Sequence, residues 1–544
     1  MGAAGKAWLM IDRNDKSYMR MTWLLIALCS SGRILFSRLF LLTPDETNYW
    51  QWARHLAWGY HDQAPLIAWA INLTTRLFGH SELGVRLPSI VAMAVASVYA
   101  ALIARRWLSP RIAWHSAVLI QSVFAFNVGG LLATADGLKG AAWAATSYHT
   151  ARGFEDNQWR QWLLGGVWFG LGLLSKYSMV IILASIFFYA LCSPNHRRRL
   201  ASIKPYWGCA IGLLLFTPVI AWNAANHWNS LRHVAYLGGA NESFSLHLNY
   251  LAEYIASQAG LLSPLVFILV CGSWWWVLRR RSSDDHWIYL FLFFTSFPIV
   301  ISFALLSLHT RVYPNWPCAG YTTAAILSTG LWLDSSSDMN GRRKRRVRPL
   351  WRWTVASSYL LTATILFHAV WHFLPIPANI DRTAYEIKGW DKLGQNVADL
   401  QRTMPASSNT FIFSVGYQLA SLMAFYMPGQ PQTVCINRWS RPNVYDYWWR
   451  DEDLIGKDAI GVIENPNRRN RLLLVFERVD PPIPSHLYAR DTAAPVDNHP
   501  TPLKTFYLYR CYGFKGGLRW VPTKKGDIRV SIQDAPLHSG EPEP

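Results

Sequence analysis

The chain has 544 residues, of which 51% are hydrophobic and 16% charged, and its formal net charge is +19 at pH 7. This composition excludes one ordinary soluble domain and favours a membrane protein. The Lys and Arg residues stand in short clusters between apolar runs rather than in one basic patch. That distribution is typical of membrane topology and argues against nucleic acid as a partner.

About eleven apolar segments are long enough to cross a bilayer alone or with help from neighbouring helices. Basic residues precede the first segment and no small-residue cleavage site follows it, so we expect an uncleaved first helix with a cytoplasmic N-terminus. The predicted segments start near Met21, Leu83, Ile112, Asp136, Trp162, Tyr177, Tyr206, Leu251, Trp287, Tyr313 and Trp351.

Basic clusters test this topology, because short cytoplasmic loops are rich in Lys and Arg. With the N-terminus inside, all of the clusters fall on the cytoplasmic side, and the acidic and aromatic loops fall outside. The clusters are Arg105, Arg106 and Arg111; Arg152 and Arg160; Arg197, Arg198, Arg199 and Lys204; Arg279, Arg280 and Arg281; and Arg342 to Arg346.

The segment from 162 to 191 predicts a tight helical hairpin that turns at Lys176. Three glycines on its first helix, Gly166, Gly170 and Gly172, permit neighbouring backbones to approach closely. We therefore expect these glycines to serve packing.

The chain divides into a transmembrane domain, residues 1–374, and a small extracytoplasmic α/β domain, residues 375–544, in which hydrophobic runs shorten and alternate with turns. Cys435 and Cys511 lie in the second domain, where either a disulfide bond or two free thiols are compatible with the sequence. Its last residues, Ser539 to Pro544, are predicted to be disordered. The predicted elements are strands at Thr410–Ser414, Gln432–Ile436, Ala459–Ile463 and Leu472–Phe476 and a helix at Gln418–Tyr426.

The first external loop carries two adjacent acids, Asp45 and Glu46, directly after a membrane helix, where charge is costly. A carboxylate in a partly dry cleft can act as a general base that takes the proton of an attacking hydroxyl. We predict that Asp45 and Glu46 are catalytic, with Asp45 as the base. A second interpretation stays open, because Asp is also favoured at helix N-caps and the following residues look helical.

Asp136 is a third candidate catalytic acid, at the start of another external helix, although its composition alone favours a capping role. Four cations, Arg86, Lys176, His309 and Arg311, stand at the same predicted outer surface. Several cations together can hold a phosphate leaving group. For any one of them, contact with lipid headgroups is the alternative.

Polar and aromatic side chains of the outer loops complete the predicted site. The His61–Asp62 pair resembles part of a divalent metal site, but no third ligand is evident, so a metal ion stays an open question. The predicted substrate-binding residues are Tyr49, Trp50, Arg54, Tyr60, His61, Asp62 and Asn315.

These motifs resemble bacterial glycosyltransferases of the GT-C fold that are related to dolichyl-phosphate-mannose protein mannosyltransferases and to the lipid A aminoarabinose transferase. The resemblance covers roughly the first two-thirds of the chain and extends faintly into Leu419 to Pro428. The matching residues are Asp45-Glu46, Tyr49-Trp50, Gly59-Tyr60, Pro65-Leu66, Arg86-Leu87-Pro88, Leu173 to Tyr177, Trp222-Asn223 and Pro314-Asn315-Trp316-Pro317.

The resemblance implies a multi-pass enzyme of the bacterial inner membrane with its C-terminal domain in the periplasm. It implies inverting transfer of a sugar from a polyprenyl-phosphate carrier to an envelope lipid, glycan or protein, with Asp45 as base and basic residues on the phosphate. One departure concerns Asp136, which lies in Thr134-Ala135-Asp136-Gly137 where relatives commonly have Thr-Pro-Asp-Ala-Pro.

Two other classes of function are compatible with a membrane protein of this size. A flippase for a lipid-linked sugar predicts charges midway inside helices and paired discontinuous helices, whereas the acids here cluster at one face. A membrane-anchored receptor would give the large membrane domain no function beyond anchoring. The enzyme is therefore the preferred hypothesis, and the flippase is the alternative.

Overall fold

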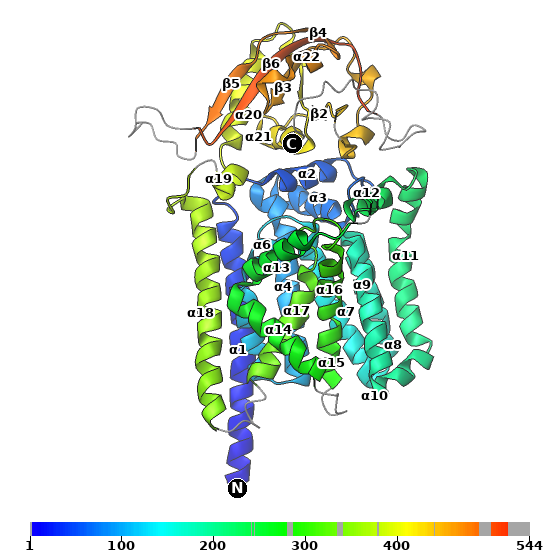
Figure 1. Cartoon of the computed structure of the whole chain (residues 1–544), viewed down its shortest axis with the longest axis vertical. Helices are drawn as coiled ribbons and strands as arrows, with labels where there is room; N and C mark the ends of the chain where they lie inside the picture. Colours follow the sequence, from blue (N-terminus) through cyan, green and yellow to red (C-terminus); the bar gives the residue numbers. More distant parts are fainter. Residues whose placement is uncertain are drawn as a thin grey trace. The chain divides into compact units, whose positions relative to one another are not determined.

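The computed structural model describes residues 3–240, 242–243, 245–279, 287–333, 341–377, 380–439, 441–488 and 502–519, with side chains from residue 15 and not for 341–348. It forms two compact units (Figure 1). The first unit contains residues 1–38, 63–221 and 234–366, and the second contains 39–62, 222–233 and 367–544. Arg280, Arg281, the side chains of Arg342 to Arg346 and the predicted tail Ser539 to Pro544 lie outside the described residues.

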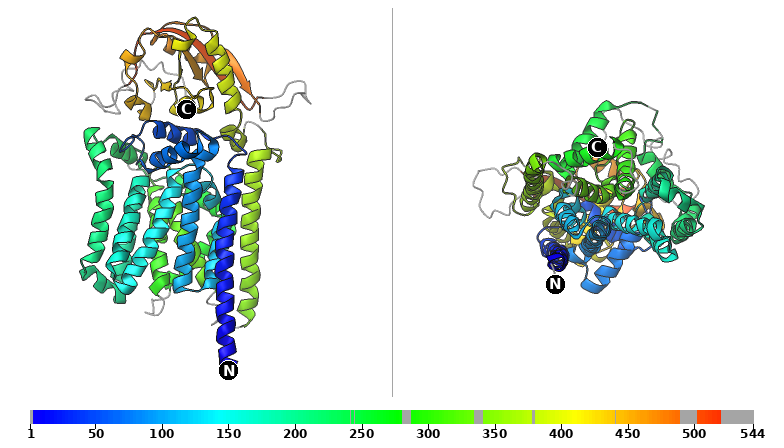
Figure 2. Two further views of the ribbon diagram at one scale, coloured as in Figure 1. Left: turned by 180° about the vertical axis from the view of Figure 1, so that it is seen from behind. Right: turned by 90° about the horizontal axis from the view of Figure 1, so that it is seen from below.

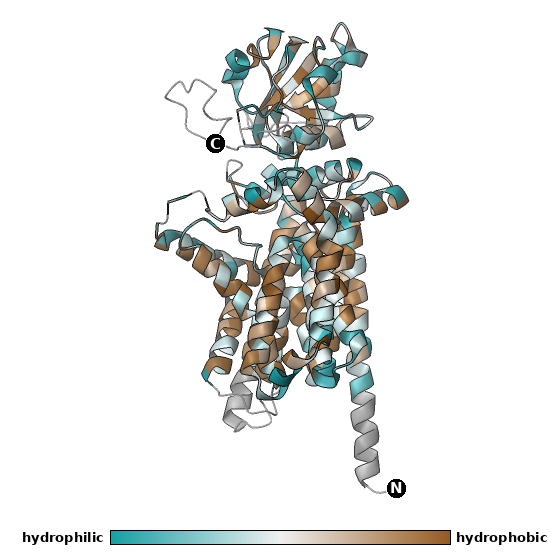
Figure 3. Cartoon of the chain, turned by 90° about the vertical axis from the view of Figure 1, so that its right-hand side faces the viewer, coloured by the Kyte–Doolittle hydropathy of each residue, from teal (hydrophilic) through white to brown (hydrophobic). Residues whose placement is uncertain are grey.

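The first unit is a bundle of helices whose long members run roughly parallel (Figure 2). Apolar residues dominate these helices along most of their length (Figure 3). The α-helices of the first unit among the described residues, short ones included, are α1 (Ala3–Phe36), α3 (Leu66–Phe78), α4 (Glu82–Trp107), α5 (Pro110–Ser122), α6 (Phe124–Gly129), α7 (Ala135–Asp156), α8 (Trp159–Ser175), α9 (Ile181–Cys192), α10 (Pro194–Arg197), α11 (Lys204–Ala225), α13 (Leu248–Leu262), α14 (Pro264–Arg279), α15 (Trp287–Phe294), α16 (Phe297–Leu306), α17 (Cys318–Leu333) and α18 (Gly341–Trp371).

Five helical segments among the described residues are long and apolar enough to cross a membrane, and two bent helix pairs raise the number to seven. One of these pairs, α13 with α14, bends by 109° where a single span was predicted near Leu251. Other predicted spans form shorter helices, such as α5 with 13 residues and α17 with 16. The predicted count of about eleven spans therefore stays a prediction.

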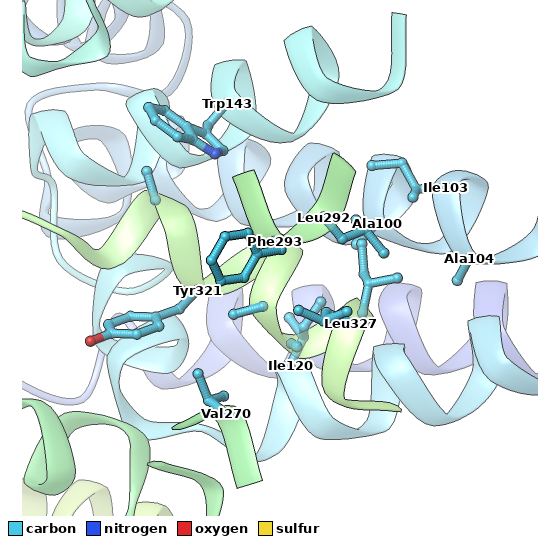
Figure 4. Packing of buried hydrophobic residues seen from close by; sticks show 14 of the residues in the cluster. Ala100, Ile103, Ala104, Ile120, Trp143, Val270, Leu292, Phe293, Tyr321 and Leu327 are labelled. Carbon is cyan, nitrogen blue, oxygen red and sulfur yellow. The ribbon is translucent and has the colours of Figure 1, made fainter. Parts of the chain in front are cut away.

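Aromatic and aliphatic side chains from several helices form the core of the first unit (Figure 4). Trp143 is completely buried, and its indole N–H donates to the Thr295 carbonyl oxygen. The Tyr321 hydroxyl likewise donates to the Gln258 amide oxygen. These two polar groups inside the core are thus hydrogen-bonded, as is usual for polar groups buried away from water.

The predicted hairpin consists of α8, a short 3-10 turn (η1, Tyr177–Val180) and α9. The expected packing role of its glycines is confirmed. A Cβ atom at Gly166 would collide with the Gly208 backbone on α11, and one at Gly172 would lie 2.6 Å from the Met179 side chain. At Gly166 only a residue without a side chain permits this approach, because the neighbouring atoms belong to the backbone.

The second unit contains a six-stranded mixed sheet in the order β2-β1-β3-β6-β4, and β5 pairs with the first part of β6, at residues 504–508. Strands β1, β2 and β3 are parallel, and β6 runs antiparallel to its neighbours. The bounds are β1 (Phe411–Ser414), β2 (Thr433–Cys435), β3 (Ala459–Ile463), β4 (Phe476–Val479), β5 (Ile483–Leu487) and β6 (Lys504–Phe514), with helices α2 (Pro44–Arg54), α12 (Asn229–Leu237, ending in the first unit), α19 (Arg382–Ile387), α20 (Trp390–Arg402), α21 (Tyr417–Tyr426) and α22 (Arg469–Leu472).

Side chains alternate between the two faces of this sheet. Ile412, Ile460 and Phe506 face a core shared with α20 and α21, whereas Phe413 and Tyr509 belong to a separate core on the other face. This two-residue period follows from strand geometry. On the first of these faces, α21 packs against β1 and β2. Helix α21 also contacts α2, which belongs to the first external loop.

Three predicted strands and the helix at 418–426 are confirmed, but the predicted strand Leu472–Phe476 is wrong. Helix α22 ends at Leu472, and β4 begins only at Phe476. Both residues pack in the same core, so the apolar run reflects burial rather than an extended backbone. Cys435 and Cys511 are buried free thiols, which decides the open question against a disulfide bond.

Candidate active site

Helix α2 of the second unit begins with a capping box. The Thr43 hydroxyl accepts from the Glu46 backbone N–H, and the Glu46 carboxylate accepts from the Thr43 backbone N–H at 2.9 Å. Pro44 occupies the first helical position, where the absence of an N–H costs nothing. The N-cap role considered for Asp45 therefore belongs to Thr43, and Glu46 is buried in the cap.

Asp45 occupies the second helical position, and its carboxylate makes no hydrogen bond to another described residue. Its side chain is exposed to water, yet the surrounding protein still desolvates it. This desolvation, reinforced by the charges of Glu386, Asp62 and Glu46, raises the pKa of Asp45 to about 6. A carboxylate that water reaches and whose pKa is raised can take up and release a proton near neutral pH.

Asp62 is the second acid of this region, and it pairs with His233 on α12, with 3.4 Å between Oδ1 and Nε2. Burial raises the pKa of Asp62 to about 6 and lowers that of His233 to about 4. Burial also lowers the pKa of His61, whose ring contacts the Tyr447 hydroxyl at 3.2 Å. Both histidines are therefore neutral at pH 7 and offer hydrogen bonds rather than charge.

The loop after α2 is fixed by aromatic packing. Tyr60 is buried, stacks on Trp52 at a centroid distance of 4.4 Å, and donates its hydroxyl proton to the Trp52 carbonyl oxygen. Gly59 allows Trp222 to pack closely, because a Cβ atom at Gly59 would lie 2.9 Å from that indole ring. Tyr60 thus holds the loop that carries His61 and Asp62.

Other predicted substrate-binding residues of α2 serve packing in this structure. Trp50 is buried with its ring edge toward Phe425, and the Arg54 guanidinium lies over the Trp50 ring at 4.7 Å. Arg54 also donates to the Pro431 carbonyl oxygen. Tyr49 packs edge-on against Trp52.

A separate charged cluster lies in the first unit, where α7 begins. Asp136 accepts from the Lys176 ammonium at 2.7 Å and pairs with Lys139 at 3.0 Å. The Asn315 amide also donates to Asp136. The Ser175 hydroxyl donates to the Ala135 carbonyl oxygen, which fastens the hairpin turn beside α7. The structure therefore brings together three predicted residues, Asp136, Lys176 and Asn315.

The remaining predicted phosphate-binding cations make contacts elsewhere in the first unit. Arg86 is completely buried and donates to the Ser37 carbonyl oxygen at 2.6 Å. The His309 ring contacts the Gly239 carbonyl oxygen. Arg311 is exposed and pairs with Glu253 at 3.2 Å. Their roles in binding stay predictions.

Sequence reasoning missed several residues of these two regions. Lys139 stands three positions after Asp136 on a helix, a spacing that signals contact. Tyr417 lies close to Asp45 and Asp62, whose charges help to raise its pKa. Arg441 opposes this effect and lowers the pKa of both acids. Tyr417 and Arg441 are far away in sequence, so only the fold reveals them.

A metal site at His61 and Asp62 finds no further support. Within the described ranges, no group of three or more His, Cys, Asp and Glu residues is placed to hold a metal ion.

Comparisons with known proteins agree with the sequence motifs. A family model described as dolichyl-phosphate-mannose-protein mannosyltransferase matches residues 62–222. Lipid A galacturonosyltransferase RgtD of Rhizobium johnstonii is 25% identical over 298 residues, which cover 53% of this chain and 60% of the relative. Undecaprenyl phosphate-alpha-4-amino-4-deoxy-L-arabinose arabinosyl transferase of Pseudomonas aeruginosa is 28% identical over 233 residues, which cover 38% of this chain and 41% of that protein. The chain thus spans less than two thirds of these relatives.

Solved structures extend the similarity to most of the chain. The crystal structure of ArnT from Cupriavidus metallidurans in the apo state has a TM-score of 0.58 at 13% identity and covers 93% of this chain and 98% of that one. The structure of the same protein bound to undecaprenyl phosphate has a TM-score of 0.56 and covers 89% and 97%. The chain is therefore a membrane protein of the GT-C fold, related to the dolichyl-phosphate-mannose-protein mannosyltransferases and to ArnT.

Proposed function

We propose that the chain transfers a sugar from a polyprenyl-phosphate-linked donor to an acceptor of the bacterial cell envelope, with inversion at the anomeric carbon. The relatives carry names that specify lipid A or an undecaprenyl phosphate sugar, which favours a lipid acceptor. We place the reaction at the periplasmic face of the inner membrane, where the positive-inside rule puts the acidic loops.

The state of Asp45 is the observation that carries the proposal. Thr43 and Glu46 cap α2, so the Asp45 carboxylate is available, exposed, and has a pKa of about 6. In the proposed reaction, Asp45 takes the proton of the acceptor hydroxyl while that oxygen attacks the anomeric carbon. The bond between the anomeric carbon and the phosphate oxygen breaks, and polyprenyl phosphate leaves.

Hydrogen-bonding groups near Asp45 fit a sugar as ligand. His61 Nε2 and Asp62 Oδ2 are buried and have no hydrogen-bond partner among the described residues. Buried polar atoms normally find such partners. We assign His61 and Asp62 to hydroxyl groups of the donor or acceptor sugar, in agreement with their predicted role.

The leaving phosphate needs cations, because negative charge develops on it as the bond breaks. We assign this task to Lys176, whose ammonium contacts Asp136 but is not buried. Asp136, which accepts a hydrogen bond from Asn315, then orients Lys176. The other predicted cations, Arg86, His309 and Arg311, are secondary candidates.

Mass spectrometry of lipid A, envelope glycans and membrane proteins tests the proposal. Cells with the wild-type chain, with Asp45→Asn and without the chain would be compared. We expect a sugar-sized mass on lipid A that only the wild type produces. Unchanged masses in all three strains, with a polyprenyl-linked sugar accumulating on one leaflet in the deletion strain, would contradict transfer and support the flippase.

A further inference from the structure

Lys139 is a completely buried cation that no motif of the sequence singled out. Its ammonium donates to the Trp316 carbonyl oxygen at 2.9 Å and to the Ser178 hydroxyl at 3.3 Å, and it pairs with Asp136 Oδ1 at 3.0 Å. Two hydrogen bonds and one ion pair thus hold the ammonium, and the side chain is 0% exposed. Lys139 is therefore out of reach of a ligand.

Asp136 divides its two oxygens between two lysines. Oδ1 faces Lys139, and Oδ2 accepts from Lys176 and from the Asn315 amide. The side chain of Lys139 is 0% exposed, whereas that of Lys176 is 19% exposed. Of the two lysines, Lys176 is thus the one that a ligand can reach.

The formal charges of this cluster decide what it attracts. One carboxylate and two ammonium groups leave a net charge of +1, whereas Asp136 and Lys176 alone would be neutral. Charge differences of this kind weigh more in a partly buried site than in water, because screening is weaker there. A neutral pair would hold an anion weakly.

We propose that Lys139 is a positioning residue that compensates the charge of Asp136 and so leaves the charge of Lys176 available for the phosphate of the lipid-linked donor. The proposal rests on the proposed function. It means that Lys139 raises the affinity for the donor although it is buried and does not contact the donor. Asp136, in the same arrangement, fixes the orientation of Lys176 rather than reacting itself.

Binding of undecaprenyl phosphate to the purified full-length chain tests this role. Lys139→Gln keeps a donor for the Trp316 carbonyl oxygen but removes the charge, and we expect it to weaken binding by about tenfold or more. The double variant Lys139→Gln/Asp136→Asn restores a net charge of +1, and we expect affinity within about threefold of the wild type. Lys204→Met, which removes a lysine that binds the Asn157 carbonyl oxygen outside the cluster, is the control.

A purely structural role for Lys139 predicts a different pattern. Two changes at a packed junction would then lower affinity and the unfolding temperature at least as much as one, so a double variant no tighter than Lys139→Gln overturns the proposal. Wild-type affinity in Lys139→Gln overturns it as well. Failure of the wild type to bind undecaprenyl phosphate or to transfer a sugar would instead reject the proposed function itself. Parallel binding assays with inorganic phosphate show whether the cluster binds a phosphate group without the attached lipid.

Discussion

Two helices of this protein begin with the same pattern, Thr-x-Asp, and their acids end in opposite states. In α2, Thr43 caps the helix with Glu46, and the Asp45 carboxylate has no hydrogen-bond or ion-pair partner in the part of the chain that the structure describes. In α7, Thr134 makes no side-chain cap bond, and Asp136 is held by two lysines and an amide. The residue three positions after the threonine is Glu46 in one helix and Gly137 in the other. The local difference explains the two helix starts, and the contacts of Lys139, Lys176 and Asn315 make Asp136 a candidate structural anion.

The largest expected effect is the loss of sugar transfer when the Asp45 carboxylate is removed. Asp45→Asn removes the proposed base but leaves the Thr43–Glu46 cap intact, so we expect transfer to fall by about 10²–10⁴-fold without loss of the fold. Single-turnover assays with saturating donor measure the loss, and the unfolding temperature of the variant is the control. Near wild-type turnover in a folded Asp45→Asn chain would reject Asp45 as the base.

Lys176→Met tests the second acid of the comparison, Asp136. It leaves Asp136 with Lys139 alone, a neutral pair, and we expect kcat/KM for the donor to fall by roughly 10²-fold. Arg311→Met serves as the matched variant, because Arg311 is exposed and pairs with Glu253. If Arg311→Met lost as much activity as Lys176→Met, the phosphate-binding role predicted for Arg311 from sequence would gain support over the cluster.

The pH dependence of transfer gives a smaller but more specific signal. A general base must be deprotonated, and desolvation by the surrounding protein, together with nearby acidic charges, raises the pKa of Asp45 to about 6. We therefore expect kcat/KM to fall about tenfold for each unit of pH below about 6. Because the charge of Asp62 contributes to the raised pKa, Asp62→Asn should move this acid limb to lower pH. A limb that stays in place in Asp62→Asn would show that another group titrates.

The sequence was informative where function depends on neighbours along the chain. Thr43 and Glu46 match the Thr-x-x-Glu signature of a capping box, so the buried role of Glu46 was available from sequence and was overlooked. The spacing of Asp136 and Lys139 was a similar missed signal. His233, Tyr417 and Arg441 reach Asp45 and Asp62 only through the folding of the second unit, and no local pattern marks them.

The smallest expected effect tests the two threonines directly. Thr43→Ala removes a hydroxyl that accepts from the Glu46 backbone N–H, and the loss of such a cap costs about 1 kcal/mol of the free energy of unfolding. Thr134 makes no such bond, so Thr134→Ala should cost little. Equilibrium unfolding of both variants in the same detergent compares them. Equal costs would mean that the helix starts are stabilised alike, and the difference between Asp45 and Asp136 would then rest on Lys139 and Lys176 alone.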